Sequence, residues 1–383
     1  MSEPIWLGPR PPTRSEWREM QDSIGSSPAV YSALEERVEG MVADLVQRPF
    51  GVSFGSTGDA IEAALDALGA GRNNEIVIPA LCPAVLGPAA VRCGARIRYA
   101  DVDAKTLTLR AQSAEAFLNN DTRVIVGVAA HGQPAGLEEL AALAARNELP
   151  LLEVLCGGLG GNIGRDPVGR FGRIAVVALG GSESTIGSGG AVCVTNDDSL
   201  DSALRLIRNL GRREPKSEWE RIGGVRALER IGLDARMNPM QAALAEVRLK
   251  RFDETCAKLE DVFHDYLRRL AMHPDLVLPA PCADGTVRWS HFAVRLSERF
   301  GRDDRDSILQ GLLRHDIAAT SILHVLPAEP AFAHTAEGAE FRIAQRAADR
   351  LIALPFSTAL AERDIDLVCQ TLQVMIARQT ILR

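Results

Sequence analysis

Short hydrophobic runs alternate with helical patterns from about residue 50 onward. The stretches 59–69 and 136–148 place apolar residues three and four positions apart, which is the pattern of amphipathic helices. The runs that predict strands are 51–54, 75–79, 96–100, 123–128, 150–155, 173–178 and 191–195. Such alternation of strands and helices is typical of a mainly parallel sheet with helices on both faces. We therefore predict an α/β domain.

The pattern changes in the last third of the chain. Residues 237–270 continue one helical pattern, with Pro239 tolerated in its first turn, and predict a single long connector helix. A β-type run at 289–296, a helix at 303–315 and a strand-like run at 317–323 follow, then more helix. We expect an N-terminal arm (1–30), a large α/β domain (31–250), and the connector helix with a small α+β domain (251–383).

Composition narrows the class of protein. The 383 residues carry a formal charge of −7 and are 46% hydrophobic, which fits a globular protein and argues against nucleic acid as a partner. No apolar stretch approaches the roughly 20 residues that span a bilayer, and the N-terminus does not resemble a secretory signal. The seven scattered cysteines form no CxxC pair, so we expect neither a disulfide framework nor a zinc site. A cytoplasmic location, with no membrane partner, follows as an expectation.

Two glycine-rich runs, 157–164 and 180–190, invite interpretation as phosphate loops. Neither contains the GxxxxGK[ST] pattern, and neither fits GxGxxG with an acidic residue at the required distance. The chain also lacks HExxH and GxSxG, and its histidines are isolated, so we expect no metal site.

The order of several longer segments resembles one family, the DegT/StrS-type sugar aminotransferases. The segments that carry the resemblance are GSTGDAIEAALDALG (55–69), EIVIPALCPAVLGPAAVRCGARIRYADVDAKTL (75–107), RVIVGVAAHGQPAGLEELAALA (123–144), LPLLEV (149–154), GGAVCVTND (189–197), LRLIRNLGR (204–212), GLDARMNPMQAALAEVRLKRFDE (232–254) and ALPFSTALAERDIDLV (353–368). The resemblance covers nearly the whole chain. It implies the fold of aspartate aminotransferase, the fold type I of pyridoxal phosphate (PLP) enzymes: a large domain with a mainly parallel seven-stranded sheet and a smaller C-terminal domain.

The position of the family's catalytic lysine holds a serine in this chain. The family forms its internal aldimine with PLP on a lysine before the GxGG turn, and that position is Ser182. No lysine occurs between Phe171 and Asp197. Of the 43 basic residues only four are lysines, and they lie elsewhere: Lys105, Lys216, Lys250 and Lys258. The resemblance therefore implies that no Schiff base forms at this site.

Other positions that meet the cofactor in the family also differ. Val154 replaces the aspartate that pairs with the pyridinium nitrogen, which removes electrostatic support for PLP chemistry. Gly157 replaces a glutamine, and Pro83 replaces the stacking aromatic residue. The phosphate loop reads Ser56, Thr57, Gly58, Asp59 and Ala60, where a carboxylate could repel phosphate. Asp234 replaces the asparagine of the family's NxRM motif, while Arg236 and Met237 match.

Together these differences indicate a homologue that no longer uses PLP, so no cofactor is expected. The expected ligand crevice comprises Thr57, Gly58, Asp59, Cys82, Pro83, Val154, Gly157, Gly181, Ser182, Asp234 and Arg236. Three functions remain open: a binding protein for a sugar nucleotide or pathway intermediate, an enzyme with non-PLP chemistry, or an active PLP-dependent aminotransferase acting on a keto sugar. Replaced chemistry would draw on the candidates Ser182, Glu183, Ser184, Cys156, Cys82, Glu153 and His131. The family resemblance also implies a homodimer, or a heterodimer in which this chain is a non-catalytic partner of an active paralogue.

Overall fold

The computed structural model describes residues 4–25, 29–180, 184–213, 227–335 and 340–381. Its centre is a seven-stranded sheet in the order β1-β10-β9-β6-β5-β2-β4. The strands are β1 (Phe50–Phe54), β2 (Glu75–Pro79), β4 (Arg96–Ala100), β5 (Thr122–Ala130), β6 (Leu151–Cys156), β9 (Ile174–Ala178) and β10 (Ala191–Thr195). β10 runs antiparallel to β1 and β9, and the other neighbouring strands of this sheet pair in parallel. All seven predicted strands and the predicted α/β class are confirmed.

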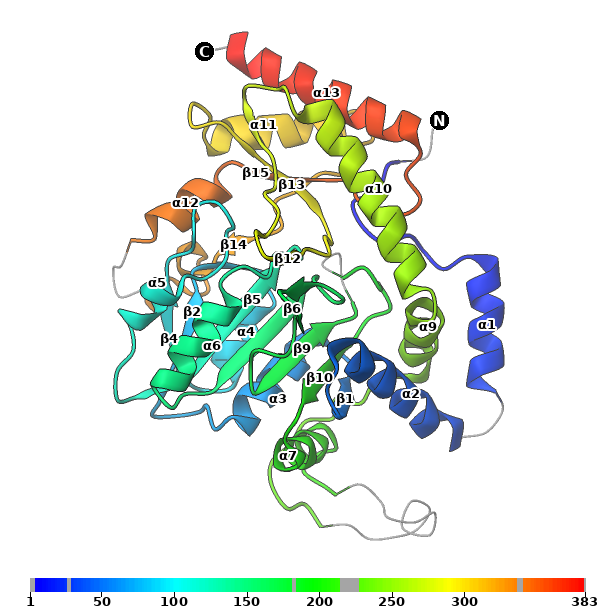
Figure 1. Ribbon diagram of the computed structural model, residues 1–383, viewed down its shortest axis with the longest axis vertical. Helices are drawn as coiled ribbons and strands as arrows, with labels where there is room; N and C mark the ends of the chain where they lie inside the picture. Colours follow the sequence, from blue (N-terminus) through cyan, green and yellow to red (C-terminus); the bar gives the residue numbers. More distant parts are fainter. Residues whose placement is uncertain (1–3, 26–28, 181–183, 214–226, 336–339, 382–383) are drawn as a thin grey trace.

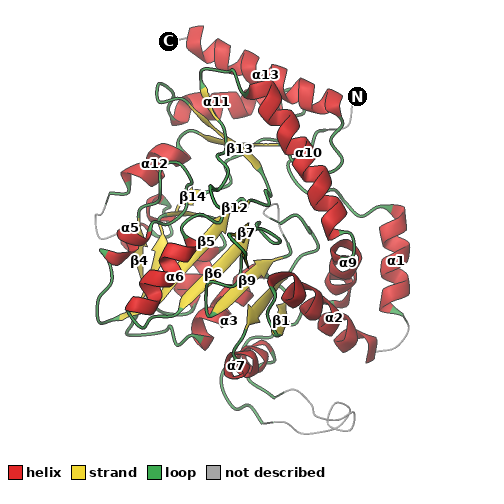
Figure 2. Ribbon diagram, in the orientation of Figure 1, coloured by secondary structure: helices red, strands yellow, loops and turns green. Residues whose placement is uncertain are grey.

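Helices cover both faces of this sheet (Figure 2). The strands consist of continuous apolar runs because both of their faces are buried. One face packs on α3 (Thr57–Ala67), α4 (Leu86–Arg92) and α7 (Asp198–Arg208). The other face packs on α2 (Ala29–Val46), α5 (Ala111–Glu115), α6 (Leu137–Arg146) and α9 (Pro239–Leu249). The carboxyl ends of β1, β5 and β6 thus lie at one edge of the sheet, between its two layers of helices.

A second core lies above the sheet in the orientation of Figure 1. The helices α10 (Phe252–Leu270), α11 (Arg302–Leu313) and α13 (Glu362–Ile381) pack on an antiparallel sheet of β11 (Leu276–Val277), β13 (Phe292–Leu296) and β15 (Leu351–Leu354). The remaining elements are β3 (Leu81–Cys82), β7 (Asn162–Ile163), β8 (Asp166–Pro167), β12 (Gly285–Thr286), β14 (His324–Val325), η1 (Leu326–Ala328), η2 (Ala333–Thr335) and α12 (Arg342–Ala348). Pairing of β12 with β7 and of β14 with β3 joins the later segments to the chain that follows β6 and β2.

Two predictions about local structure are wrong. The single long connector helix is interrupted at Lys250 and Arg251, between α9 and α10. The break allows α9 to bury its apolar face in the core under the large sheet and α10 to bury its face in the second core. The strand-like run 317–323 forms only isolated bridges, Ile317 with Ile5 and Thr320 with Ala353.

The N-terminal arm crosses from the second core to the large sheet. The amide of Ile5 donates to the carbonyl of Asp316 (2.9 Å), and the amide of Phe356 donates to the carbonyl of Leu7 (2.9 Å). The arm then enters α1 (Arg14–Ile24), which Thr13 caps together with Glu16 in a capping box. Figure 1 shows this blue segment running from the level of α13 down to α1 beside α9. The arm therefore connects the two parts of the structure.

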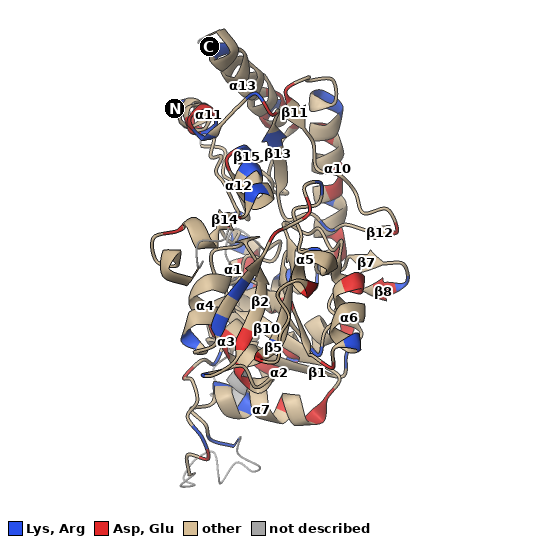
Figure 3. Ribbon diagram, turned by 90° about the vertical axis from the view of Figure 1, so that its left-hand side faces the viewer, with Lys and Arg blue, Asp and Glu red and all other residues tan. Residues whose placement is uncertain are grey.

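Charges of both signs are interspersed along the elements in the view of Figure 3. Within the described ranges, no helix is both long and apolar enough to span a membrane.

Candidate functional site

The turn between β1 and α3 holds the first group of expected crevice residues. The Ser56 hydroxyl accepts the Asp59 amide (3.0 Å) and donates to the Asp59 carboxylate (2.7 Å), which caps α3. Arg92 lies 3.9 Å from the same carboxylate, and its Nη2 would be 3.3 Å from a Cβ placed on Gly58. The charge of Asp59 is therefore partly offset within the chain.

Two other segments pack against this turn. The amide of Gly55 donates to the carbonyl of Ala235 (2.8 Å), and Gln241 donates to the carbonyl of Gly55 (3.1 Å). Thr57 donates a long hydrogen bond to the carbonyl of Gly190 (3.5 Å). At Gly190, φ is +78° and a Cβ would lie 2.6 Å from the Phe54 carbonyl oxygen, so only glycine fits. The structure thus brings Thr57, Gly58 and Asp59 close to the glycine turn.

Asp234 and Arg236 flank Ala235 in one of these segments. Arg236 forms an ion pair with Glu35 of α2, whose carboxylate is largely buried. Asp234 is exposed, and its backbone forms an isolated antiparallel β-bridge with Asn209, which follows α7. Both residues of the expected crevice therefore lie near the start of α3.

The end of β6 places Val154 and Cys156 on the same face of the sheet. Val154 is 1% exposed, lies in the apolar core on this face of the sheet, and pairs in register with Val128 of β5 and Val176 of β9. Cys156 is buried in the same core. At Gly157, φ is +94° and a Cβ would lie 2.4 Å from Ser290 Oγ. Glycine at this position therefore allows Ser290 to approach the carboxyl end of β6.

Glu153 points away from Val154 and Cys156, because successive side chains of a strand face opposite sides. Its carboxylate accepts the amides of Gly169 (2.8 Å) and Gly172 (2.6 Å). Burial raises the pKa of Glu153, although these amides and the charge of Arg48 oppose the rise. The structure does not bring Glu153 together with the other candidates. Instead, the Glu153 carboxylate anchors the turn 169–172.

Cys82 and Pro83 follow the carboxyl end of β2, and Cys82 belongs to the same core. Cys82 is fully buried and pairs in register with His324 of β14. The Pro83 carbonyl accepts the amide of Leu86 at the start of α4. Both residues occupy packed positions beside the loop that precedes α4.

His131 follows β5 with φ of +45°, an unusual conformation for a side-chain-bearing residue. Its ring stacks on Trp289 with centroids 5.8 Å apart, and Nδ1 is buried with no hydrogen-bond partner among the described residues. Burial, with the charges of His291 and Arg295, lowers the pKa of His131 to about 3. It lines a cavity of about 20 Å³, room for roughly one water. His131 therefore does not share a cavity with Ser184.

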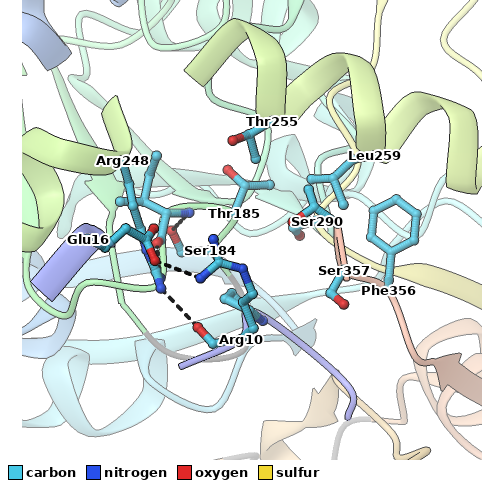
Figure 4. Close-up of a pocket in the computed structure, with 13 residues that line it drawn as sticks. Arg10, Glu16, Ser184, Thr185, Arg248, Thr255, Leu259, Ser290, Phe356 and Ser357 are labelled. Carbon is cyan, nitrogen blue, oxygen red and sulfur yellow. Dashed lines mark hydrogen bonds and ion pairs between the residues drawn. The ribbon is translucent and has the colours of Figure 1, made fainter. Parts of the chain in front are cut away.

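The described neighbour of Ser182 is Ser184, and it lines a pocket between the two cores (Figure 4). Gly181, Ser182 and Glu183 themselves lie outside the described residues. Ser184 is buried and accepts the amide of Ile186 (3.1 Å). The other polar side chains that line this pocket of about 60 Å³ come from segments far apart in the sequence: Arg10, Glu16, Thr185, Arg248, Thr255, Ser290, Ser357 and Thr358.

Arg248 of α9 fixes the loop that follows the Ser182 position. It donates to the carbonyls of Ile186 (2.7 Å), Gly187 (3.1 Å) and Arg10 (2.9 Å), and contacts Glu16 (3.4 Å). Arg10 donates to Glu16 from the other side (2.6 Å). Burial raises the pKa of Glu16, but bonds from Arg10 and the Thr13 amide and both arginine charges outweigh it and lower the pKa to about 2. Glu16 is therefore ionised at neutral pH.

Sequence reasoning missed the residues of this pocket other than Ser184. The Thr13-x-x-Glu16 capping box was a signal for the start of α1, but nothing in the local sequence marks Arg10, Ser290 or Ser357.

A second pocket of about 260 Å³ adjoins the first, since Thr185, Leu259 and Phe356 line both. It is also lined by Glu260 and His264 of α10 and by the segment 285–289. Arg288 of that segment pairs with Glu260 (3.0 Å). We call the two pockets together the inter-domain crevice. The described residues contain no group of three or more His, Cys, Asp or Glu side chains that could hold a metal.

Comparison with solved structures places this architecture in a known class. DesV of S. venezuelae, solved with a ketimine intermediate, is 25% identical with a TM-score of 0.80, and the match covers 94% of this chain and 95% of that one. PseC of Helicobacter pylori, an aminotransferase of pseudoaminic acid biosynthesis, is 17% identical with a TM-score of 0.88 over 98% and 100% of the two chains. The fold is that of the PLP-dependent aminotransferases, the predicted fold type I.

Within this class, residues 15–373 match the model of the DegT/DnrJ/EryC1/StrS aminotransferase family, and the chain belongs to that family. GDP-perosamine synthase of Caulobacter vibrioides is 29% identical over 320 residues, covering 83% of each chain. The erythromycin biosynthesis sensory transduction protein EryC1 of Saccharopolyspora erythraea is 28% identical over 358 residues, covering 91% of this chain and 92% of that one. The family comprises nucleotide-sugar aminotransferases of sugar and natural-product biosynthesis.

Proposed function

We propose that this chain is a PLP-independent homologue of the nucleotide-sugar aminotransferases, with a crevice that binds a sugar nucleotide or a biosynthetic intermediate. One observation carries the proposal: no lysine occurs between Phe171 and Asp197, where the family resemblance implies the Schiff-base lysine at the position of Ser182. A hydroxyl cannot form an imine with an aldehyde. The aminotransferase reaction of the family therefore has no starting group in this chain.

The lysines that the structure describes give no substitute. Lys250 pairs with Glu246 (2.9 Å) and Lys258 with Glu254 (2.7 Å), both along helices. Lys105 lines the small cavity beside His131. Lys216 lies outside the described residues, in the charged run 211–224.

The surroundings of Val154 do not fit the cofactor either. A pyridinium nitrogen needs a carboxylate, and Val154 offers an apolar side chain in an apolar core. Glu153, the adjacent acid, faces the opposite side of the sheet and is held by two amides. The proposed binding function therefore does not require PLP.

The residues of the chain support binding and orientation instead. Arg248, which contacts Glu16, donates to the carbonyls of Ile186 and Gly187, and six hydroxyl-bearing side chains and Arg10 line the pocket next to this loop. The relatives named as nucleotide-sugar aminotransferases favour a sugar nucleotide or a pathway intermediate as the ligand class. Replaced, non-PLP chemistry would use Ser182, Glu183 or Ser184, of which Ser184 lines this pocket.

The test is spectroscopic. The purified protein is incubated with PLP, passed through a desalting column, treated with borohydride and analysed by intact mass. We expect no aldimine band and no added mass, and a Ser182→Lys variant handled in parallel reports whether a lysine at this position captures PLP. An aldimine band in the wild-type chain, retained covalently after borohydride, would refute the proposal and restore the active aminotransferase.

The oligomeric state tests the partner alternative. Size-exclusion chromatography with light scattering, performed on the chain alone and with an active family member from the same genome, distinguishes a homodimer from a heterodimer. Restoration of aminotransferase turnover by the mixture beyond that of the active member alone would support a non-catalytic partner subunit. A stable monomer in both samples would exclude both dimers.

A further inference from the structure

The guanidinium of Arg10, in the inter-domain crevice, has N–H groups that make no hydrogen bond to the described residues. Its Nη1 donates to Glu16 (2.6 Å) and to the Pro11 carbonyl (3.1 Å), while Nε and Nη2 have no partner within the described parts of the chain. A guanidinium carries five N–H groups in a planar fork, so an edge remains available to a ligand. Figure 4 shows this side chain among the pocket residues, with Glu16 on one side and Thr185 and Ser290 on the other.

The charge balance of the pocket favours a single negative charge. Arg10 and Arg248 contribute two positive charges, and Glu16 contributes one negative charge. Arg248 directs its donors to Ile186, Gly187, Arg10 and Glu16. The excess positive charge is therefore presented to the pocket by Arg10.

Neutral hydroxyl groups surround this cation. Thr185, Thr255 and Thr358 are half-buried, and among the described residues their hydroxyls have no hydrogen-bond partner. Ser290 and Ser357 lie deeper and already contact His291 and the Ala359 amide. Each threonine hydroxyl can both donate and accept, which suits the hydroxyl groups of a polyol.

The volumes of the two pockets fit a ligand with a small anionic group at one end and a longer chain attached to it. The inner pocket, about 60 Å³, has room for roughly four water-sized groups, so it accommodates a carboxylate and an adjacent carbinol. The adjoining pocket of about 260 Å³ extends past Thr185 toward Thr286 and Arg288. One carboxylate matches one guanidinium edge through two parallel hydrogen bonds.

We propose that the inter-domain crevice binds a hydroxylated monocarboxylate of the sugar-acid class, with its carboxylate on Arg10 and its hydroxyls on Thr185, Thr255 and Thr358. The proposal rests on the proposed function, because it requires a crevice free of PLP. It specifies the chemical class of the ligand and the residue of the N-terminal arm that recognises it.

Isothermal titration calorimetry of the full-length protein with D-gluconate tests the proposal. Glucitol, which lacks the carboxylate, and glucose 6-phosphate, which carries a phosphate, serve as matched compounds. We expect saturable binding of gluconate at least tenfold tighter than that of either. Equal affinity for glucitol would overturn the role of the charge, and tighter binding of glucose 6-phosphate would overturn the assignment to a carboxylate.

Variants separate recognition from folding. We expect Arg10→Gln to weaken gluconate binding at least tenfold, and Thr358→Val, which lies outside the arm, to weaken it severalfold. Arg18→Gln, an exposed arginine of α1, is the control and retains wild-type affinity. Because Arg10 also pairs with Glu16, urea unfolding midpoints are measured for each variant. Unchanged gluconate affinity in both Arg10→Gln and Thr358→Val would refute the assignment.

The two proposals fail in different ways. An aldimine band in the wild-type protein would refute the proposed function whatever the calorimetry shows. Absence of the band together with absence of gluconate binding would refute the sugar-acid site alone.

Discussion

His131 is buried as a neutral ring, and this makes a quantitative prediction about pH. Its pKa is about 3 in the folded chain against 6.5 for an exposed histidine. Between these values the unfolded chain binds more protons than the folded one, so stability falls as the pH falls. The contribution of the neutral His131 ring to the free energy of unfolding is present above about pH 6.5 and is lost progressively toward pH 3. For a single group, this linkage amounts to about 2 kcal/mol between pH 7 and pH 5.

The measurement compares wild type with His131→Phe, which keeps an aromatic ring against Trp289 but cannot titrate. Urea unfolding free energies are determined at pH 7 and at pH 5. Glu153 acts in the opposite direction, since its raised pKa makes stability fall as the pH rises above its unfolded value. That contribution is present in both proteins and cancels in the difference.

We expect the pH-dependent loss in the wild type to exceed that in His131→Phe by about 2 kcal/mol. His315→Phe, at an exposed histidine, is the control and keeps the wild-type pH response. If His131→Phe and the wild type lose equal stability between pH 7 and pH 5, His131 is not held neutral by burial and the reasoning fails.

Two further predictions concern stability. Glu39 accepts hydrogen bonds from Ser53 and Arg208 in the core, so Glu39→Gln removes the negative charge that Arg208 contacts there and should cost about 3–5 kcal/mol in urea unfolding; a loss below 1 kcal/mol, as expected for Glu62→Gln because its partner Arg92 is about half exposed, would contradict this. Gly190→Ala should lower the melting temperature because its Cβ meets backbone, whereas Gly40→Ala in α2, with open space around it, should raise stability by roughly 0.5–1 kcal/mol; the opposite order would contradict both.

The sequence predicted the central sheet well because each strand is a compact apolar run buried on both faces. The bounds of β2, β4 and β10 coincide with the predicted runs. The break between α9 and α10 was not predictable, since neither glycine nor proline interrupts the helical pattern at Lys250 and Arg251. The break occurs because α9 buries its apolar side chains in the core of the large sheet and α10 buries its own in the second core.

The site was predictable only where it follows from local sequence. Val154 lies on β6 and Gly157 directly follows it, so their places in the fold follow from the predicted strand 150–155. Glu153 was grouped with Cys156 by proximity in sequence, although strand alternation places their side chains on opposite faces. Arg10 and Ser357 converge on Ser184 from distant segments, and hydrophobic periodicity carries no information about such long-range contacts.

The pairing of the arm with the second core has a consequence for biosynthesis. Ile5 and Leu7 are synthesised before their hydrogen-bond partners, Asp316, Ala318 and Phe356, which follow more than 300 residues later. Because domains begin to fold during synthesis from the N-terminal side, the large sheet can assemble while the arm still has no docking partner. The arm is then among the last of these segments to dock, and the pocket around Arg10 is completed only when residues 356–358 have been translated.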